Sequence, residues 1–99
     1  MKIILDDQRN FPTKGDYNCV RTYEACILLL SAFKEISFIS LDFDLDSKYK
    51  GYDILVYMHE NGIRPKHINI HSDHSYGKSQ MRCYAHKCFH VAIVTENKL

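Results

Sequence analysis

Short apolar runs alternate with longer helical patterns along the whole chain. Compact apolar runs predict strands at Lys2–Leu5 and Phe38–Leu41, and the polar–apolar alternation of His67–His71 predicts a third strand with one less buried face. Further short strands are expected near Cys19–Arg21 and within His90–Thr95. Because the strands are separated by helices, right-handed crossovers and a mostly parallel sheet follow.

The intervening segments have the apolar spacing of amphipathic helices. The first helix follows the candidate N-cap Thr22, the second begins at Tyr52 and ends at Asn61-Gly62, and the third follows a predicted loop at 73–77. Their apolar stripes are Cys26, Leu29, Leu30 and Phe33, then Tyr52, Leu55, Val56 and His59, then Met81, Tyr84, Ala85 and Cys88. The predicted fold is an α/β three-layer sandwich with a four- or five-stranded, mostly parallel sheet.

Size and composition limit the chain to one unit. Its 99 residues, 45% of them apolar, fit one compact core, so residues 1–99 are taken as a single domain. The net charge of +1 provides no global attraction to nucleic acid or to an anionic membrane. No membrane span or secretion signal is recognisable, so four free cysteine thiols and a cytoplasmic location are expected.

Polar residues that can do chemistry follow three of the predicted strands. Asp6 and Asp7 follow the first, Asp42 follows the second, and His71-Ser72 ends the third. Open parallel sheets bind ligands beyond the carboxyl ends of their strands, where these side chains would meet. Clustered carboxylates repel one another, and a hard cation such as Mg²⁺ relieves the repulsion. The alternative is that each aspartate is a solvated turn or cap residue.

The order of these residues resembles the phosphorylation site of receiver domains. The matching features are the acidic pair after the first strand, Asp42, Gly51 at the start of a helix, and Ser72 after a later strand. The resemblance implies a flavodoxin-like topology, metal binding by the acidic pair, a phosphoacceptor at Asp42 and a phosphate-sensing hydroxyl at Ser72. The Lys-Pro that receivers carry after their fifth strand does not follow the last predicted strand here.

A narrower group is more similar, namely the cyclic-phosphate-processing receiver-like domains, which are implicated in RNA end metabolism. The shared motifs span most of the chain: Leu5-Asp6-Asp7-Gln8-Arg9, Val20-Arg21-Thr22, Ser40-Leu41-Asp42-Phe43-Asp44-Leu45, Gly51-Tyr52-Asp53 and Ile70-His71-Ser72. A loop in place of a receiver's first helix is also similar. Two positions depart from that group: Phe43 stands where it has histidine, and His74 stands where it has asparagine.

The resemblance implies a metal-dependent phosphoesterase acting on cyclic phosphates or nucleotide ends. Mg²⁺ or Mn²⁺ would be held by Asp6, Asp7 and Asp42, with Asp42 alternatively the nucleophile. His71 would act as general acid or base, and Ser72 would complete the catalytic group. Phosphate would be bound by Arg9, Arg21, Ser72 and His74. As an alternative to lost activity, His74 would replace the imidazole absent at position 43.

A different class of function stays open. A catalytically silent receiver-like module would bind a partner protein or be switched by phosphorylation at Asp42, whereas the enzyme would meet RNA ends or a cyclic nucleotide, and neither requires a membrane. A zinc site at Cys83, His86 and His90 is disfavoured, since no paired short-spaced cysteine motif accompanies them.

Overall fold

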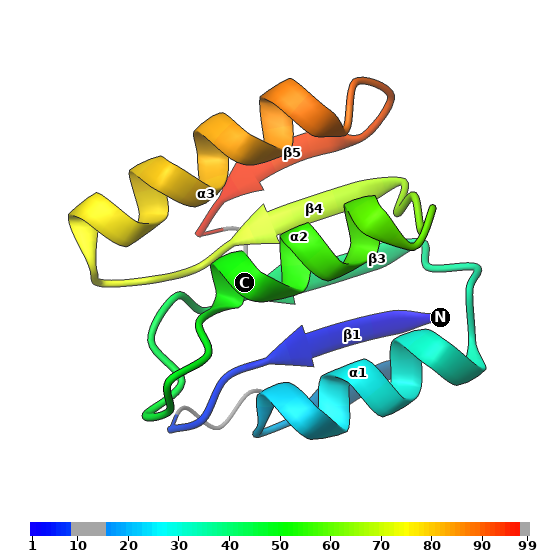
Figure 1. Cartoon of the computed structure of the whole chain (residues 1–99), viewed down its shortest axis with the longest axis horizontal. Coiled ribbons are helices and arrows are strands. Elements are labelled where there is room, and N and C mark those ends of the chain that lie inside the picture. The colour runs from blue at the N-terminus through cyan, green and yellow to red at the C-terminus, as the bar shows by residue number, and fades with distance from the viewer. Residues whose placement is uncertain (9–15, 98–99) are drawn as a thin grey trace.

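The protein is a five-stranded parallel sheet covered by helices (Figure 1). The computed structural model describes residues 1–8 and 16–97. Its elements, in chain order, are β1 (Lys2–Leu5), β2 (Tyr17–Val20), α1 (Tyr23–Ala32), β3 (Phe38–Leu41), α2 (Gly51–Glu60), β4 (His67–Ile70), α3 (Ser75–Cys88) and β5 (Ile93–Glu96).

The strand order is β2-β1-β3-β4-β5, and every neighbouring pair is parallel. Leu5, Leu41 and Ile70 lie in one row of the register, so β1, β3 and β4 end at the same edge of the sheet. The predicted flavodoxin-like α/β fold is confirmed, and the residues that follow these three strands are brought together.

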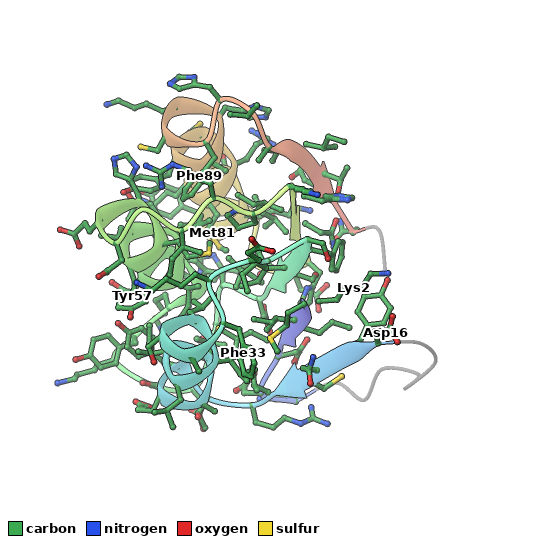
Figure 2. All side chains as sticks on the ribbon, turned by 90° about the vertical axis from the view of Figure 1, so that its right-hand side faces the viewer. Lys2, Asp16, Phe33, Tyr57, Met81 and Phe89 are labelled. Carbon is green, nitrogen blue, oxygen red and sulfur yellow. The ribbon has the colours of Figure 1, made fainter. Side chains whose placement is uncertain are left out.

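The described residues form two layers rather than the three expected. Helices α1, α2 and α3 all lie on one face of the sheet, as Figure 1 and the perpendicular view in Figure 2 show. The crossovers from β2 to β3, from β3 to β4 and from β4 to β5 all advance in the same direction across the sheet. Because each crossover is right-handed, each places its helix on the same face.

The hydrophobic core lies between the helices and this face. Ile39 and Leu41 of β3 and Ile68 and Ile70 of β4 are fully buried in the core cluster that the helices complete. Side chains alternate along a strand, so Ser40, His67 and Asn69 point to the opposite face. No helix in the described part of the chain is long and apolar enough to cross a membrane.

Local sequence signals explain where α1 begins, but they did not predict where α3 begins. Thr22 caps α1 as predicted, its hydroxyl accepting from the backbone N–H of Ala25 at 3.1 Å. The predicted loop at 73–77 is shorter, because α3 begins at Ser75. The imidazole of His74 provides the cap by accepting from the backbone N–H of Gly77 at 2.9 Å. Histidine is outside the usual set of capping residues, so the sequence did not reveal this helix start.

A glycine at the start of α2 allows the helix to approach the end of β3. An ideal Cβ built on Gly51 would lie 2.1 Å from the carbonyl oxygen of Asp42 and 2.9 Å from the methyl carbon of Met81. The first contact is with backbone, which cannot be rotated away. Only glycine therefore fits between α2 and the segment that carries the Asp42 carboxylate.

We expect Gly51→Ala to reduce the free energy of unfolding by about 1–3 kcal/mol, the usual cost of overpacking. Urea denaturation followed by circular dichroism measures this change. A variant as stable as the wild type would show that the Asp42 backbone has room to move.

Candidate functional site

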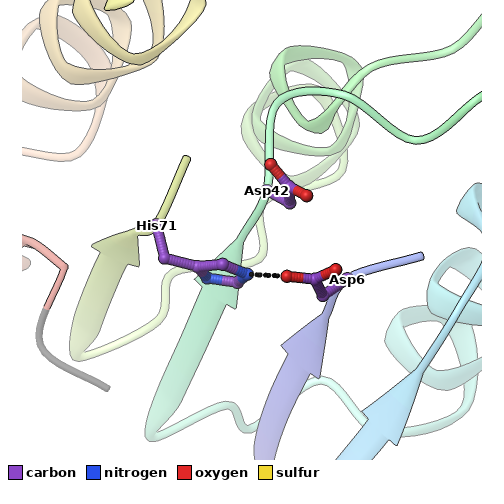
Figure 3. A group of neighbouring side chains, drawn as sticks. All are labelled: Asp6, Asp42 and His71. Atoms are coloured by element: carbon purple, nitrogen blue, oxygen red, sulfur yellow. Dashed lines mark hydrogen bonds and ion pairs between the residues drawn. The ribbon is translucent and has the colours of Figure 1, made fainter. Parts of the chain in front are cut away.

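Asp6, Asp42 and His71 meet at the carboxyl edge of the sheet, each directly beyond the end of its strand (Figure 3). One potential ligand atom from each residue lies within 4.8 Å of the others. Among the described residues, these three are the potential metal ligands that lie close enough together to hold one ion. Cys83, His86 and His90 are not brought together in such a group. Of the three carboxylates predicted to cluster at this edge, Asp6 and Asp42 belong to the group, whereas Asp7 lines the same pocket without belonging to it.

Asp6 and His71 form a buried pair in the centre of the site. His71 Nε2 lies 3.0 Å from Asp6 Oδ2, and each residue is 2% exposed. The other carboxylate oxygen of Asp6 accepts from the backbone N–H of Gln8 at 2.9 Å. The Asp6 carboxylate thus has a fixed orientation, and His71 is shielded from solvent beneath it.

Asp42 is held less tightly and is half-buried. Its carboxylate accepts hydrogen bonds from the backbone N–H of Asp44 and from the Ser72 hydroxyl, which both favour the charged form. Burial, followed by the negative charge of Asp6, outweighs them and raises the pKa of Asp42 to about 6. Ser72 Oγ also accepts from the backbone N–H of His74 at 3.1 Å, so Ser72 links Asp42 to the start of α3.

The pocket above this group has a volume of ≈370 Å³ and is strongly acidic. Burial raises the pKa of Asp7, with further contributions from Asp6, Asp46 and Asp44. The described lining residues are Asp6, Asp7, Gln8, Asp42, Asp44, Asp46, Ser72, Asp73 and His74. This many carboxylates in one pocket create a strongly negative potential that favours a cation.

The two positions that depart from the cyclic-phosphate-processing pattern are in contact. The rings of Phe43 and His74 lie 4.8 Å apart between centroids, at an interplanar angle of 32°. Phe43 also packs on Gly77, where an added Cβ would lie 2.3 Å from the ring. Phenylalanine at 43 and histidine at 74 are thus one packed unit, with the imidazole at the pocket wall.

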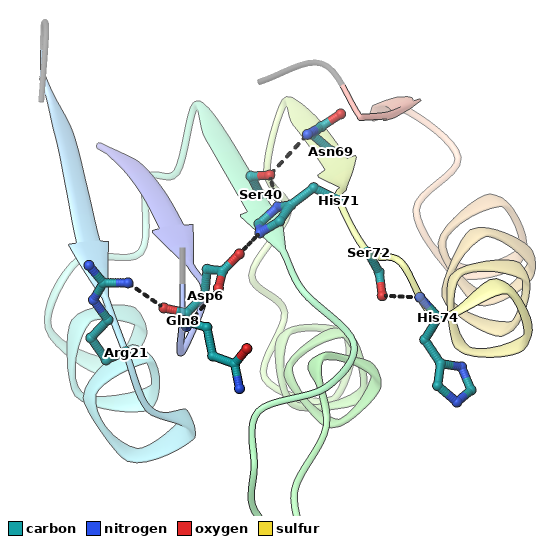
Figure 4. Close-up of polar contacts among 8 residues, drawn as sticks. All are labelled: Asp6, Gln8, Arg21, Ser40, Asn69, His71, Ser72 and His74. Atoms are coloured by element: carbon teal, nitrogen blue, oxygen red, sulfur yellow. Dashed lines mark hydrogen bonds and ion pairs between the residues drawn. The ribbon is translucent and has the colours of Figure 1, made fainter. Parts of the chain in front are cut away.

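The predicted phosphate-binding arginines have different outcomes. Arg21 Nη1 donates to the backbone carbonyl of Asp6 at 3.2 Å, which places its guanidinium beside the site (Figure 4). Arg21 is not among the described residues that line the pocket. Arg9 lies outside the described residues.

Sequence analysis missed a row of polar side chains beneath His71. Ser40 Oγ lies 2.5 Å from His71 Nδ1 and accepts from Asn69 Nδ2 at 2.9 Å (Figure 4). Asn69 Oδ1 accepts from Thr95 Oγ1 at 2.7 Å, and Thr95 Oγ1 lies 2.7 Å from His67 Nε2. Ser40, Asn69, Thr95 and His67 are called the polar row below.

The polar row corrects the prediction of a less buried face on β4. Ser40 and Asn69 are fully buried, and the hydrogen bond between them replaces the contacts with water that each side chain has lost. The available signal was a serine in the otherwise apolar run of β3 and the alternating polar residues of β4, which the parallel register places side by side. The pairing of Ser40 with Asn69 could not be predicted from the sequence, because it depends on the register of β3 and β4.

Comparison with known families agrees with the geometry. The family model described as cyclic-phosphate processing receiver domain matches residues 1–87, which include Asp6, Asp42 and His71. No curated protein and no solved structure gives a significant match.

The raised pKa of Asp42 predicts a specific pH dependence of stability. Folding raises this pKa from 3.8 to about 6, so the stabilisation from the bound proton is complete below about pH 4 and is lost as the pH rises through 6. We therefore expect metal-free Asp42→Asn to become more stable than wild type as the pH rises over this range. Urea titrations at a series of pH values measure the difference. Asp16→Asn, which changes an exposed aspartate before β2, is the control and should have the same pH dependence as wild type. Parallel plots of the free energy of unfolding against pH for wild type and Asp42→Asn would contradict the prediction.

Proposed function

Because the chain belongs to the family of cyclic-phosphate processing receiver domains, we propose that its acidic pocket binds a divalent cation together with a phosphate ester. The proposed activity is metal-dependent opening of a cyclic phosphate, either on a nucleotide or at an RNA end. The observation that carries the proposal is the acidic lining of the pocket around Asp6 and Asp42.

A phosphate group and this pocket have the same sign of charge. Within the described lining, carboxylates outnumber every other charged or titratable group, and the pKa of Asp42 is already raised by burial and, after that, by the negative charge of Asp6. An anionic phosphodiester would be repelled unless a cation entered with it. The pocket therefore supports phosphate chemistry only with a metal ion.

The donor set fits Mg²⁺ or Mn²⁺. These ions prefer oxygen ligands, and Asp6, Asp7 and Asp42 offer carboxylate oxygens that line one pocket. When bound, such an ion would neutralise charge that develops on the phosphoryl oxygens. Asp6 is suited to be the fixed ligand, since His71 and the Gln8 N–H already hold its orientation.

Ser72 and His74 also line the pocket, and their hydrogen bonds indicate what each could do there. The Ser72 hydroxyl donates its one hydrogen to Asp42, so it is placed to orient that carboxylate. His74 lies at the pocket wall with Nδ1 engaged by the Gly77 N–H, and its Nε2 is the ring atom available to a substrate. His71 is buried, so His74 is the histidine that is better placed to donate a hydrogen bond to a substrate.

The proposed reaction is hydrolysis. A water oxygen forms a bond to phosphorus, one ring P–O bond breaks, and the freed ribose oxygen takes a proton, which leaves a phosphate monoester. The proton comes from solvent, and His74 Nε2–H is placed to donate a hydrogen bond to that oxygen. The proton released by the attacking water passes to a pocket carboxylate or to solvent.

We expect Mg²⁺ or Mn²⁺ to raise the melting temperature of the wild type, because a ligand that binds only the folded state stabilises it by RT ln(1 + [L]/Kd). Asp42→Ala should lose most of this response. Asp16→Ala, which removes an exposed carboxylate before β2, should keep it. Differential scanning fluorimetry with and without EDTA measures the response, and an equal shift in all three proteins would exclude the Asp42 site.

We expect a 2′,3′-cyclic nucleotide, or a short RNA ending in a 2′,3′-cyclic phosphate, to be opened to a monoester in a reaction that EDTA stops. His74→Ala should slow the reaction by about 10²–10³-fold, the usual cost of removing one hydrogen bond to an oxygen on which charge develops. Phosphorus NMR or gel shifts of the labelled RNA end follow the product. Metal binding without turnover of either substrate would reject the enzyme and favour the alternative of a catalytically silent receiver-like module that binds a partner protein.

A further inference from the structure

The two nitrogens of His71 have different surroundings, and the difference is built by the polar row. Nε2 faces the Asp6 carboxylate at 3.0 Å, whereas Nδ1 faces the Ser40 hydroxyl at 2.5 Å. The ring is 2% exposed. Which nitrogen carries the hydrogen therefore depends on which way the Ser40 hydroxyl points.

Asn69 restricts the direction of that hydroxyl. Asn69 Nδ2 donates to Ser40 Oγ, so the Ser40 hydrogen points away from Asn69, and the contact at 2.5 Å offers it His71 Nδ1 as an acceptor. An amide has a donor end and an acceptor end that cannot exchange without turning the group over. Unlike a chain of hydroxyls, Asn69 therefore imposes one direction on the hydrogen bonds next to it.

Thr95 and His67 in turn fix the direction of Asn69. The Thr95 hydroxyl donates to Asn69 Oδ1, so the 2.7 Å contact from Thr95 to His67 requires a hydrogen on His67 Nε2. The register pairs Ser40 with Asn69 and Asn69 with Thr95, so the row crosses three adjacent strands.

We propose that Ser40 and Asn69 are positioning residues that hold His71 with its hydrogen on Nε2, aimed at Asp6. In this arrangement neither ring nitrogen is available to a metal ion or to a substrate. His71 instead orients the Asp6 carboxylate from behind, as outer partners of metal ligands commonly do. This part of the inference rests on the proposed metal site, whereas the hydrogen position on His71 does not.

The metal-free protein tests the hydrogen position directly. In protein labelled with ¹⁵N-histidine at alkaline pH, long-range ¹H–¹⁵N spectra distinguish a nitrogen that carries hydrogen from one that accepts it. We expect His71 to carry its hydrogen on Nε2, with Nδ1 shifted by hydrogen bonding, and Ser40→Ala to abolish that Nδ1 shift. A wild-type ring with its hydrogen on Nδ1, or an Nδ1 signal unchanged in Ser40→Ala, would overturn the proposal.

Metal titration tests the positioning role. Ser40→Ala and Asn69→Leu, the latter similar in shape but unable to donate, should each raise the Kd for Mn²⁺ by about 10- to 100-fold. Ser37→Ala is the matched control, because its hydroxyl donates to the Met1 carbonyl and does not contact the polar row. Wild-type Mn²⁺ affinity in folded Ser40→Ala and Asn69→Leu would overturn the positioning role. If wild type itself binds no Mn²⁺, the proposed function fails, and the histidine spectra still decide the hydrogen position.

Discussion

The contact between Asp6 and His71 is the interaction on which the site depends. Both groups are buried, and a charged carboxylate in that position is tolerated only with hydrogen-bond donors on its oxygens. The imidazole supplies one donor and the Gln8 backbone supplies another. Without this pair, the Asp6 carboxylate would lose the contact that fixes its orientation beside Asp42.

The parallel register makes that contact possible. Asp6 and His71 are 65 residues apart in sequence, and β3 lies between their strands in the sheet. Since β1, β3 and β4 end in the same row, residues one position beyond each strand converge without any long loop. The site is thus a consequence of strand order and strand length, and Gly51 adds the close approach of α2 that positions Asp42.

The sequence predicted the strands and the acidic edge because both are encoded locally. Apolar runs that end in aspartate are visible without knowing the fold, as is the Thr22 cap. Layer number was not visible, because it depends on the direction of each crossover across the sheet. The role of Ser40 was hidden for a similar reason: a lone serine in a strand is uninformative until the register supplies Asn69 as its partner. The contact of Phe43 with His74 likewise required the packing of α3.

The strands of this one-sided sheet differ in how deeply they are buried, and therefore in how readily they open. The central strands β3 and β4 are buried along most of their length, whereas β2 is half-buried or exposed throughout. Backbone amides in β3 and β4 should exchange with deuterium only on global unfolding, while those of β2 exchange through local fraying. Asp42 and His71 extend from the most protected strands. The Asp6 N–H, by contrast, donates to the carbonyl of Val20 at the end of β2, so local opening of this edge would reach the site through Asp6.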